Sequence, residues 1–166
     1  MTPLAQQTPV SIHRLRLRPA VAADVVFLRA LTRESLVEQH PEASGAYIDL
    51  QVRAREFDFD ERWPTAVWEV IEECGEPIGR MLVERKRGAI HLIEVVLRRG
   101  RRGVGIGSEV LATMIAQSDS EGHDLVLVVD EGSKALRFHQ QLGFDEVQTS
   151  CGAMLIRRRS RRLRER

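Results

Sequence analysis

Three glycines at alternate positions, Gly103, Gly105 and Gly107, constrain the fold of this chain more than any other feature. The run before them, AIHLIEVVL (89–97), is apolar and β-branched, which is typical of a buried strand. The stretch after them, SEVLATMIAQS (108–118), repeats apolar residues at helical spacing. A glycine turn between a strand and a helix leaves backbone N–H groups unpaired at the positive end of the helix. The sequence therefore predicts an anion-binding loop at a helix start.

The spacing of these glycines excludes two common phosphate-binding motifs. The dinucleotide fingerprint GxGxxG needs a further glycine at position 108, where the chain has Ser108. The P-loop is excluded because no Gly-Lys-Ser/Thr sequence follows the glycines. An ordinary loop with flexible glycines is the alternative to a phosphate cradle.

The other patterns predict alternating strands and helices. A period-two pattern at 12–18 predicts a first strand, which Pro19 ends. The segment 46–63 predicts a helix, with a loop as the alternative because its second half, EFDFDERW, is acidic and aromatic. Further strands are expected at 65–73, 77–85, 124–129 and in two runs within 145–158, and further helices at 22–36 and 133–142. This order predicts an α/β fold with a mixed, largely antiparallel sheet of six to seven strands, flanked by helices.

Length and charge suggest how the chain is divided. Its 166 residues suit a single domain with one core. We expect a flexible N-terminus at 1–8, a domain at 9–156 and a basic tail at 157–166. The tail has seven arginines and one glutamate, or +6, so the formal net charge of +1 leaves residues 1–156 at about −5.

Several classes of protein are disfavoured by what the sequence lacks. It has no apolar signal-peptide core and no run of membrane-spanning length, so we expect a cytoplasmic protein without a membrane partner. Cys74 and Cys151 show no metal-ligand spacing, so we expect no metal and two reduced, packed thiols.

Two motifs in this sequence resemble those of the GNAT superfamily of acyl-CoA N-acetyltransferases. Arg102, Gly105 and Gly107 match its pattern Arg/Gln-x-x-Gly-x-Gly/Ala, and ALRFHQQLGF (135–144) is similar to its second block. The likeness spans residues 12–156. It implies a fold with a splayed central strand pair and transfer of an acetyl group from acetyl-CoA to a primary amine, by direct attack in a ternary complex.

The resemblance also assigns residues to acetyl-CoA. It implies that the pyrophosphate is bound by the backbone N–H groups of Arg102, Gly103, Val104, Gly105, Ile106, Gly107 and Ser108. Pantetheine is expected along the main chain of Val95 and Leu97, with the Leu97 N–H polarising the thioester carbonyl. The arginines at 98, 99 and 101 are expected at the mouth of this site, where they could attract phosphates.

The same resemblance suggests candidate acid and base residues. His91 occupies the position of the base in one branch of the superfamily, and period-two alternation places it on the face of Val95 and Leu97. Glu94, expected on the opposite face, is either a structural hydrogen-bonding group or a second candidate base. His139 stands where the superfamily has its tyrosine acid, and Gly132 where it often has a pantetheine-binding asparagine.

The sequence does not determine the identity of the acceptor or the oligomeric state. The resemblance implies that the acceptor is determined by residues of about 33–63 and 144–153. The acidic stretch EFDFDERW either attracts a cationic amine or is a solvated helix face. Nucleic acid is disfavoured because no aromatic residues interleave with the basic runs. The main alternative to an enzyme is a non-catalytic acyl-CoA sensor or partner-binding protein of the same fold. A homodimer is left open.

Overall fold

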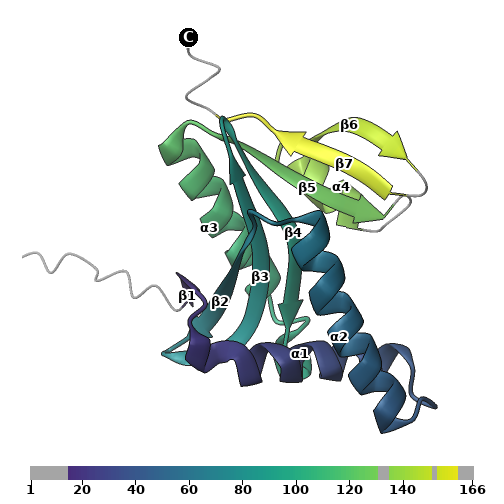
Figure 1. Ribbon diagram of the computed structural model, residues 1–166. Helices are drawn as coiled ribbons and strands as arrows, with labels where there is room; N and C mark the ends of the chain where they lie inside the picture. The colour runs from purple at the N-terminus through teal and green to yellow at the C-terminus, as the bar shows by residue number, and fades with distance from the viewer. Residues whose placement is uncertain (1–14, 131–134, 151–152, 161–166) are drawn as a thin grey trace, which may run out of the picture.

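The computed structural model describes residues 15–130, 135–150 and 153–160. Its centre is a seven-stranded sheet in the order β1-β2-β3-β4-β5-β7-β6 (Figure 1). The strands are β1 (Leu15–Pro19), β2 (Val67–Glu73), β3 (Glu76–Lys86), β4 (Ala89–Leu97), β5 (Asp124–Asp130), β6 (Asp145–Ser150) and β7 (Ala153–Arg158). All neighbours are antiparallel except β4 and β5, which confirms the predicted mixed, largely antiparallel sheet.

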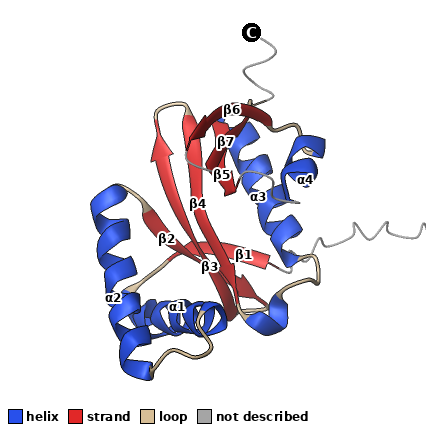
Figure 2. Cartoon of the chain, turned by 90° about the vertical axis from the view of Figure 1, so that its right-hand side faces the viewer, coloured by secondary structure: helices blue, strands red, loops and turns tan. Residues whose placement is uncertain are grey.

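Helices cover both faces of this sheet. Figure 2 shows α1 (Val25–Gln39) and α2 (Gly45–Arg62) on one side, and α3 (Ile106–Glu121) and α4 (Ala135–Gln141) on the other. The main core lies under α3, where Met114 and Val110 pack with strand residues such as Met81 and Ile90. None of the helices in the described ranges combines the length and apolar character needed to cross a membrane.

The segment 46–63, for which a loop was the alternative, is helical up to Arg62. Ser44 caps α2, because its side chain accepts a hydrogen bond from the Tyr47 N–H at 3.3 Å. Ile48 and Val52 then pack against Leu36 of α1 in a small second core. This contact fixes the two helices against each other and confirms the predicted helix.

The hairpin of β2 and β3 turns at Cys74 and Gly75. Both have positive φ, 52° and 85°, as a two-residue type I′ turn requires. The strand β3 begins at Glu76, one residue before the predicted strand at 77–85. Cys74 is free and exposed at the turn, so the expectation of a packed thiol is wrong for this residue. Cys151 lies outside the described residues.

The strand β7 extends into the expected basic tail. Arg157 and Arg158 belong to β7, and Arg158 is buried with both terminal guanidinium nitrogens 3.0 Å from the carboxylate of Asp119 on α3. These two arginines therefore contribute to the sheet. The expected flexible residues 1–8 and the tail residues 161–166 lie outside the described chain.

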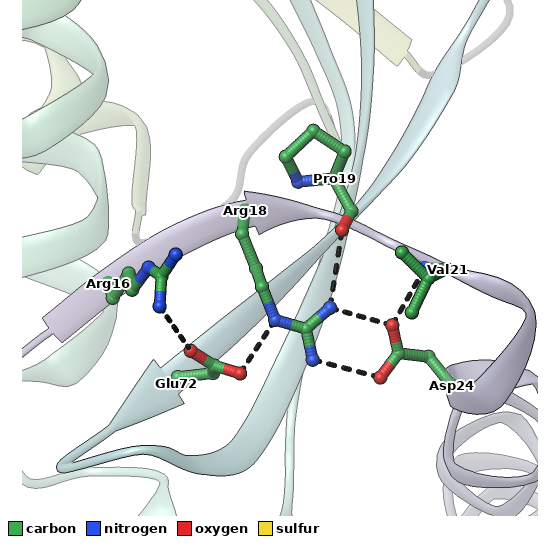
Figure 3. Close-up of polar contacts among 6 residues, drawn as sticks. All are labelled: Arg16, Arg18, Pro19, Val21, Asp24 and Glu72. Carbon is green, nitrogen blue, oxygen red and sulfur yellow. Dashed lines mark hydrogen bonds and ion pairs between the residues drawn. The ribbon is translucent and has the colours of Figure 1, made fainter.

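A polar cluster joins β1 to the start of the helices (Figure 3). Arg18 donates to Glu72 of β2 at 2.6 Å and, with two nitrogens, to Asp24 at 2.7 and 2.9 Å. Asp24 also accepts from the Val21 N–H at 2.8 Å. The buried carboxylates of Asp24 and Glu72 are thus both paired by one guanidinium, which holds the short edge strand in register.

Candidate functional site

The site is a pocket of about 420 Å³ at the place where β4 and β5 separate. The two strands pair only from Ala89 with Asp124 to Leu92 with Leu127, and then diverge. This confirms the predicted splayed strand pair. The pocket is lined by residues 92–95 of β4, residues 127–129 of β5, the first turns of α3, and Phe138 and His139 of α4.

Free backbone groups of β4 face this gap. The Arg98 N–H donates to the Ile78 carbonyl at 2.9 Å, which makes Gly79 and Leu97 a non-hydrogen-bonded pair of the β3–β4 ladder. The N–H of Leu97 therefore points away from β3, toward the gap left by β5. Two residues earlier, Val95 pairs with Met81 in the same manner and lines the pocket.

The glycine loop forms the end of the pocket beside α3. Gly103 and Gly105 have φ of 74° and 88°, a left-handed backbone that other residues rarely adopt, and Gly105 caps α3. The first N–H groups of α3, from Ile106 through Ser108, have no partner within the helix. A Cβ added at Gly107 would meet no protein atom within 4 Å, although Gly107 lines the pocket. The loop thus leaves room and unpaired donors for an anion.

Arg102 fastens this loop to the rest of the protein. Its Nε donates to the Leu97 carbonyl at 2.7 Å, and its Nη1 donates to Glu38 of α1. Both the backbone of β4 and the helix α1 are therefore held by the arginine of the predicted motif.

The neighbouring arginines contact α1 and β2. The Arg98 guanidinium lies over the Phe27 ring and Arg101 pairs with Glu73, whereas Arg99 contacts Glu34 only through its backbone N–H. The sequence alone could not show these contacts, because the partners lie far away in the chain. That these arginines attract phosphates stays a prediction.

A bulge in β4 places His91 on the opposite face of the strand from the predicted one. Leu82 pairs with Glu94 but Val83 pairs with Leu92, so Ile93 is an extra residue in the ladder. His91 is therefore opposite Glu84, on the face that also carries Glu94, and away from Val95 and Leu97. The expected face of His91 is wrong, because simple alternation does not hold across a bulge.

The surroundings of His91 differ from those of the pocket. Burial lowers the pKa of His91, and the nearby positive charge of Lys86 adds to this effect, while Glu84 opposes it. His91 is not among the residues that line the pocket.

Glu94 lines the pocket and is held by Arg80. Oε2 of Glu94 accepts from Nη2 of Arg80 at 2.9 Å. Arg80 is buried at 4% exposure, donates to Oγ1 of Thr32 at 2.6 Å and to the Leu28 carbonyl at 3.2 Å, and stacks 4.4 Å from the Trp68 ring centroid. Burial lowers the pKa of Arg80, but a guanidinium stays protonated at neutral pH. No role at the site was predicted for Arg80, although a charged residue inside an apolar strand is a signal that the sequence carries.

His139 reaches the same pocket from α4. Its ring lies edge-on to Phe144, with centroids 5.8 Å apart, and lines the pocket together with Phe138. The structure thus brings His139 and Glu94 to one cavity. Gly132, with its neighbours Glu131 and Ser133, lies outside the described residues.

The stretch EFDFDERW (56–63) belongs to the end of α2 and to Trp63, and none of its residues lines the pocket. Phe59 packs edge-to-face on Trp68 at 5.4 Å, and Asp58 pairs with Arg62 within the helix. Phe57 is exposed. Across the described ranges, no group of three or more His, Cys, Asp or Glu side chains is arranged to hold a metal ion.

The sheet order, the splayed strands and the glycine loop define a protein with the GNAT acetyltransferase fold. Solved structures agree. A PaiA N-acetyltransferase from Thermoplasma acidophilum, in complex with coenzyme A, is 16% identical and aligns over 87% of this chain and 98% of its own with a TM-score of 0.64. An acetyltransferase from Thermus thermophilus is 21% identical over 87% of this chain and 96% of its own, with a TM-score of 0.63.

The sequence profile of the Acetyltransferase (GNAT) family matches residues 27–144, and the chain belongs to this family. A structure described as histone acetyltransferase HPA2 and related acetyltransferase, from Corynebacterium glutamicum, is also similar, at 16% identity over 89% of this chain and 97% of its own, with a TM-score of 0.64. No curated protein sequence matches this chain.

Proposed function

We propose that this protein is an N-acetyltransferase that moves the acetyl group of acetyl-CoA to a primary amine by direct attack. The observation that carries the proposal is the pocket between β4 and β5, which ends at the glycine loop and the start of α3. The coenzyme A reported in the T. acidophilum structure supports this choice of cosubstrate.

The chain offers a separate site for each part of acetyl-CoA. The backbone N–H groups from Arg102 to Ser108 would bind the pyrophosphate, with the α3 dipole adding to the attraction. Pantetheine would lie in the gap, where Val95 and Leu97 present main-chain groups that β3 does not use. The apolar lining from Leu92, Leu127 and Phe138 suits its aliphatic parts.

The chemical step needs a base, an oxyanion donor and an acid. The acceptor ammonium loses a proton to Glu94, directly or through a water, and the free amine attacks the thioester carbonyl. The Leu97 N–H stabilises the negative charge on the carbonyl oxygen. The C–S bond then breaks, the nitrogen gives up its second proton to solvent, and the thiolate takes one proton from the protonated His139. The products are the amide and free CoA, with one net proton released.

We assign the base to Glu94 rather than His91 because Glu94 lines the cavity that also contains His139. Arg80 holds only Oε2 of Glu94, which leaves Oε1 for a proton or an ammonium group. The acceptor would approach from the α1–α2 side of the sheet, where the Glu94 face of β4 lies.

The test is an assay of free thiol released from acetyl-CoA across a panel of small primary amines and peptide N-termini. The variant Gly107→Leu should lose CoA binding in calorimetry by at least about tenfold, because its side chain enters the pocket without meeting protein atoms. Gly100→Leu is the matched control, since Gly100 also has open space around it but does not line the pocket.

Three results separate the alternatives. Thiol release that Gly107→Leu abolishes and Gly100→Leu retains supports the proposed function. CoA binding without thiol release from any acceptor would favour the non-catalytic sensor. Equal CoA binding by the wild type and Gly107→Leu would show that CoA does not bind in this pocket.

A further inference from the structure

The pocket between β4 and β5 has a closed end. Leu92 and Leu127 are the last pair of the two strands, and both line the pocket. Directly after Leu92, the bulge adds Ile93 to β4, and a bulge bends its strand and increases the local twist. The gap between the strands therefore begins at the pair of Leu92 and Leu127 and runs from there toward the glycine loop.

Apolar side chains fill the space behind this closed end. Leu92 and Leu127 are 7% and 5% exposed, and α3 adds Val110 and Leu111, which are 1% and 6% exposed. All four line the pocket and belong to the main core under α3. Protein interiors are close-packed, so these side chains leave no free volume behind them for further ligand atoms. We call this group the end wall (Leu92, Val110, Leu111 and Leu127).

The length of the gap places the acyl group of a bound acyl-CoA at the end wall. In the proposed function, on which this placement rests, the pyrophosphate binds at the glycine loop and pantetheine lies in the gap. Between its pyrophosphate and its sulfur, CoA has about as many bonds as four residues of extended backbone, or about 14 Å. The stretch of β4 from Leu97 to Leu92 covers about 16 Å. The sulfur therefore lies near Glu94, and a length of about 2–3 Å is left for the acyl group before the end wall.

We propose that the end wall restricts this protein to acetyl as the transferred acyl group, with Leu111 and Leu127 as the residues that determine its length. A butyryl group or a longer chain would have to displace side chains of the core, which close packing opposes. If the chain turned instead toward the α1–α2 side, it would occupy the space through which the acceptor approaches.

The chemistry of the end wall excludes a second class of acyl group. All its side chains are leucine or valine, so it offers no donor or cation. An acyl group that ends in a carboxylate, such as succinyl, would bury an unpaired charge against these side chains. The transferred group is therefore both short and uncharged.

Calorimetry with acetyl-CoA and butyryl-CoA tests the end wall by binding alone. The wild type should bind butyryl-CoA at least about tenfold more weakly than acetyl-CoA. Leu111→Ala and Leu127→Ala each shorten an isobutyl side chain to a methyl group, and should bring the two affinities within about threefold of each other. Ile115→Ala is the matched control and should keep the wild-type ratio, because Ile115 packs on the same core from α3 but does not line the pocket.

The ratio of the two affinities is taken within one variant, so a general loss of stability does not change it. Leu111→Val is a smaller change that spares the core, and it should shift the ratio in the same direction. In the thiol-release assay, the same variants should gain butyryl transfer relative to acetyl transfer.

Three results would contradict these expectations. Equal binding of acetyl-CoA and butyryl-CoA by the wild type overturns the proposed end wall. A ratio that Leu111→Ala, Leu127→Ala and Leu111→Val all leave unchanged overturns it as well. A wild type that binds neither compound overturns the proposed function itself, and the end wall with it.

Discussion

Nη2 of Arg80 lies 2.9 Å from Oε2 of Glu94, and this ion pair links a wall of the pocket to α1. The side chain of Arg80 is 5% exposed and that of Glu94 is 20% exposed. Arg80 also bonds Thr32 and the Leu28 carbonyl, both on α1. Arg80, which does not line the pocket, therefore orients the carboxylate of Glu94, which does.

Removing the cation of this pair should destabilise the fold. Arg80→Met keeps a flexible side chain against Trp68 but leaves Glu94 without its partner. We expect a loss of about 3 kcal/mol in the free energy of unfolding, measured by urea denaturation. Adding Glu94→Gln should recover part of this loss, because the second change removes the unpaired charge. Additive losses in the double variant would show that the two residues do not interact.

Acid should weaken the cluster of Figure 3 through Asp24. Hydrogen bonds from Arg18, supported by the Val21 N–H, lower the pKa of Asp24 to about 2. Because this folded-state pKa is below the unfolded-state value of about 3.9, the unfolded chain takes up the proton first as the pH falls. The pair thus contributes its full stability above about pH 4 and loses it toward about pH 2, by up to about 2 kcal/mol.

Urea unfolding of Asp24→Asn across this pH range measures the effect. The wild type should be more stable than the variant near neutral pH, and the difference should shrink as the pH falls. Asp49→Asn is the control, because Asp49 faces Arg33 in an exposed pair and should change little. A stability difference for Asp24→Asn that stays constant with pH would contradict the assignment.

Gly79 is required by the close approach of β3 to the end of β4. A Cβ at this position would lie 2.6 Å from Cδ2 of Leu97 and 2.7 Å from the Val96 carbonyl oxygen. The carbonyl belongs to the backbone of the sheet and cannot simply rotate away. We expect Gly79→Ala to cost about 1–3 kcal/mol in urea denaturation. Gly100→Ala, with nothing within 4 Å of the added Cβ, should cost much less. Equal stabilities would argue against this tight packing.

Local patterns were sufficient to predict most elements and the glycine loop. The run 89–97 corresponds to β4, and the glycines precede α3, because strand and helix periodicity are local properties. The face of His91 could not be predicted, since one extra residue at the β4 bulge reverses the alternation. The α1 partners of Arg98, Arg99 and Arg102 could not be predicted either, because they depend on how α1 packs. The ion pair of Arg80 with Glu94 could not be predicted for the same reason, because Arg80 also contacts α1.

The assignment of the base predicts a difference between two substitutions. Glu94→Gln should lower turnover at saturating acetyl-CoA by about 10²- to 10⁴-fold, because the amide cannot take the ammonium proton. His91→Gln should cause a smaller loss, since His91 does not line the pocket. The thiol-release assay measures both with the best acceptor of the panel. A larger loss in His91→Gln than in Glu94→Gln would return the base to His91.

The proton delivered to the leaving thiolate should come from His139. A CoA thiolate, with a pKa of about 8.5, is already a fair leaving group, so we expect His139→Ala to lower turnover only about 10- to 100-fold. The His139 ring also packs against Phe144, so CoA binding of the variant must be measured to separate a lost proton donor from a distorted pocket. His123→Ala is the control, because this histidine follows α3, pairs with Glu121 and does not line the pocket. If His139→Ala binds CoA normally and turns over at the wild-type rate with saturating acetyl-CoA, His139 is not the acid, and the thiolate must leave unassisted.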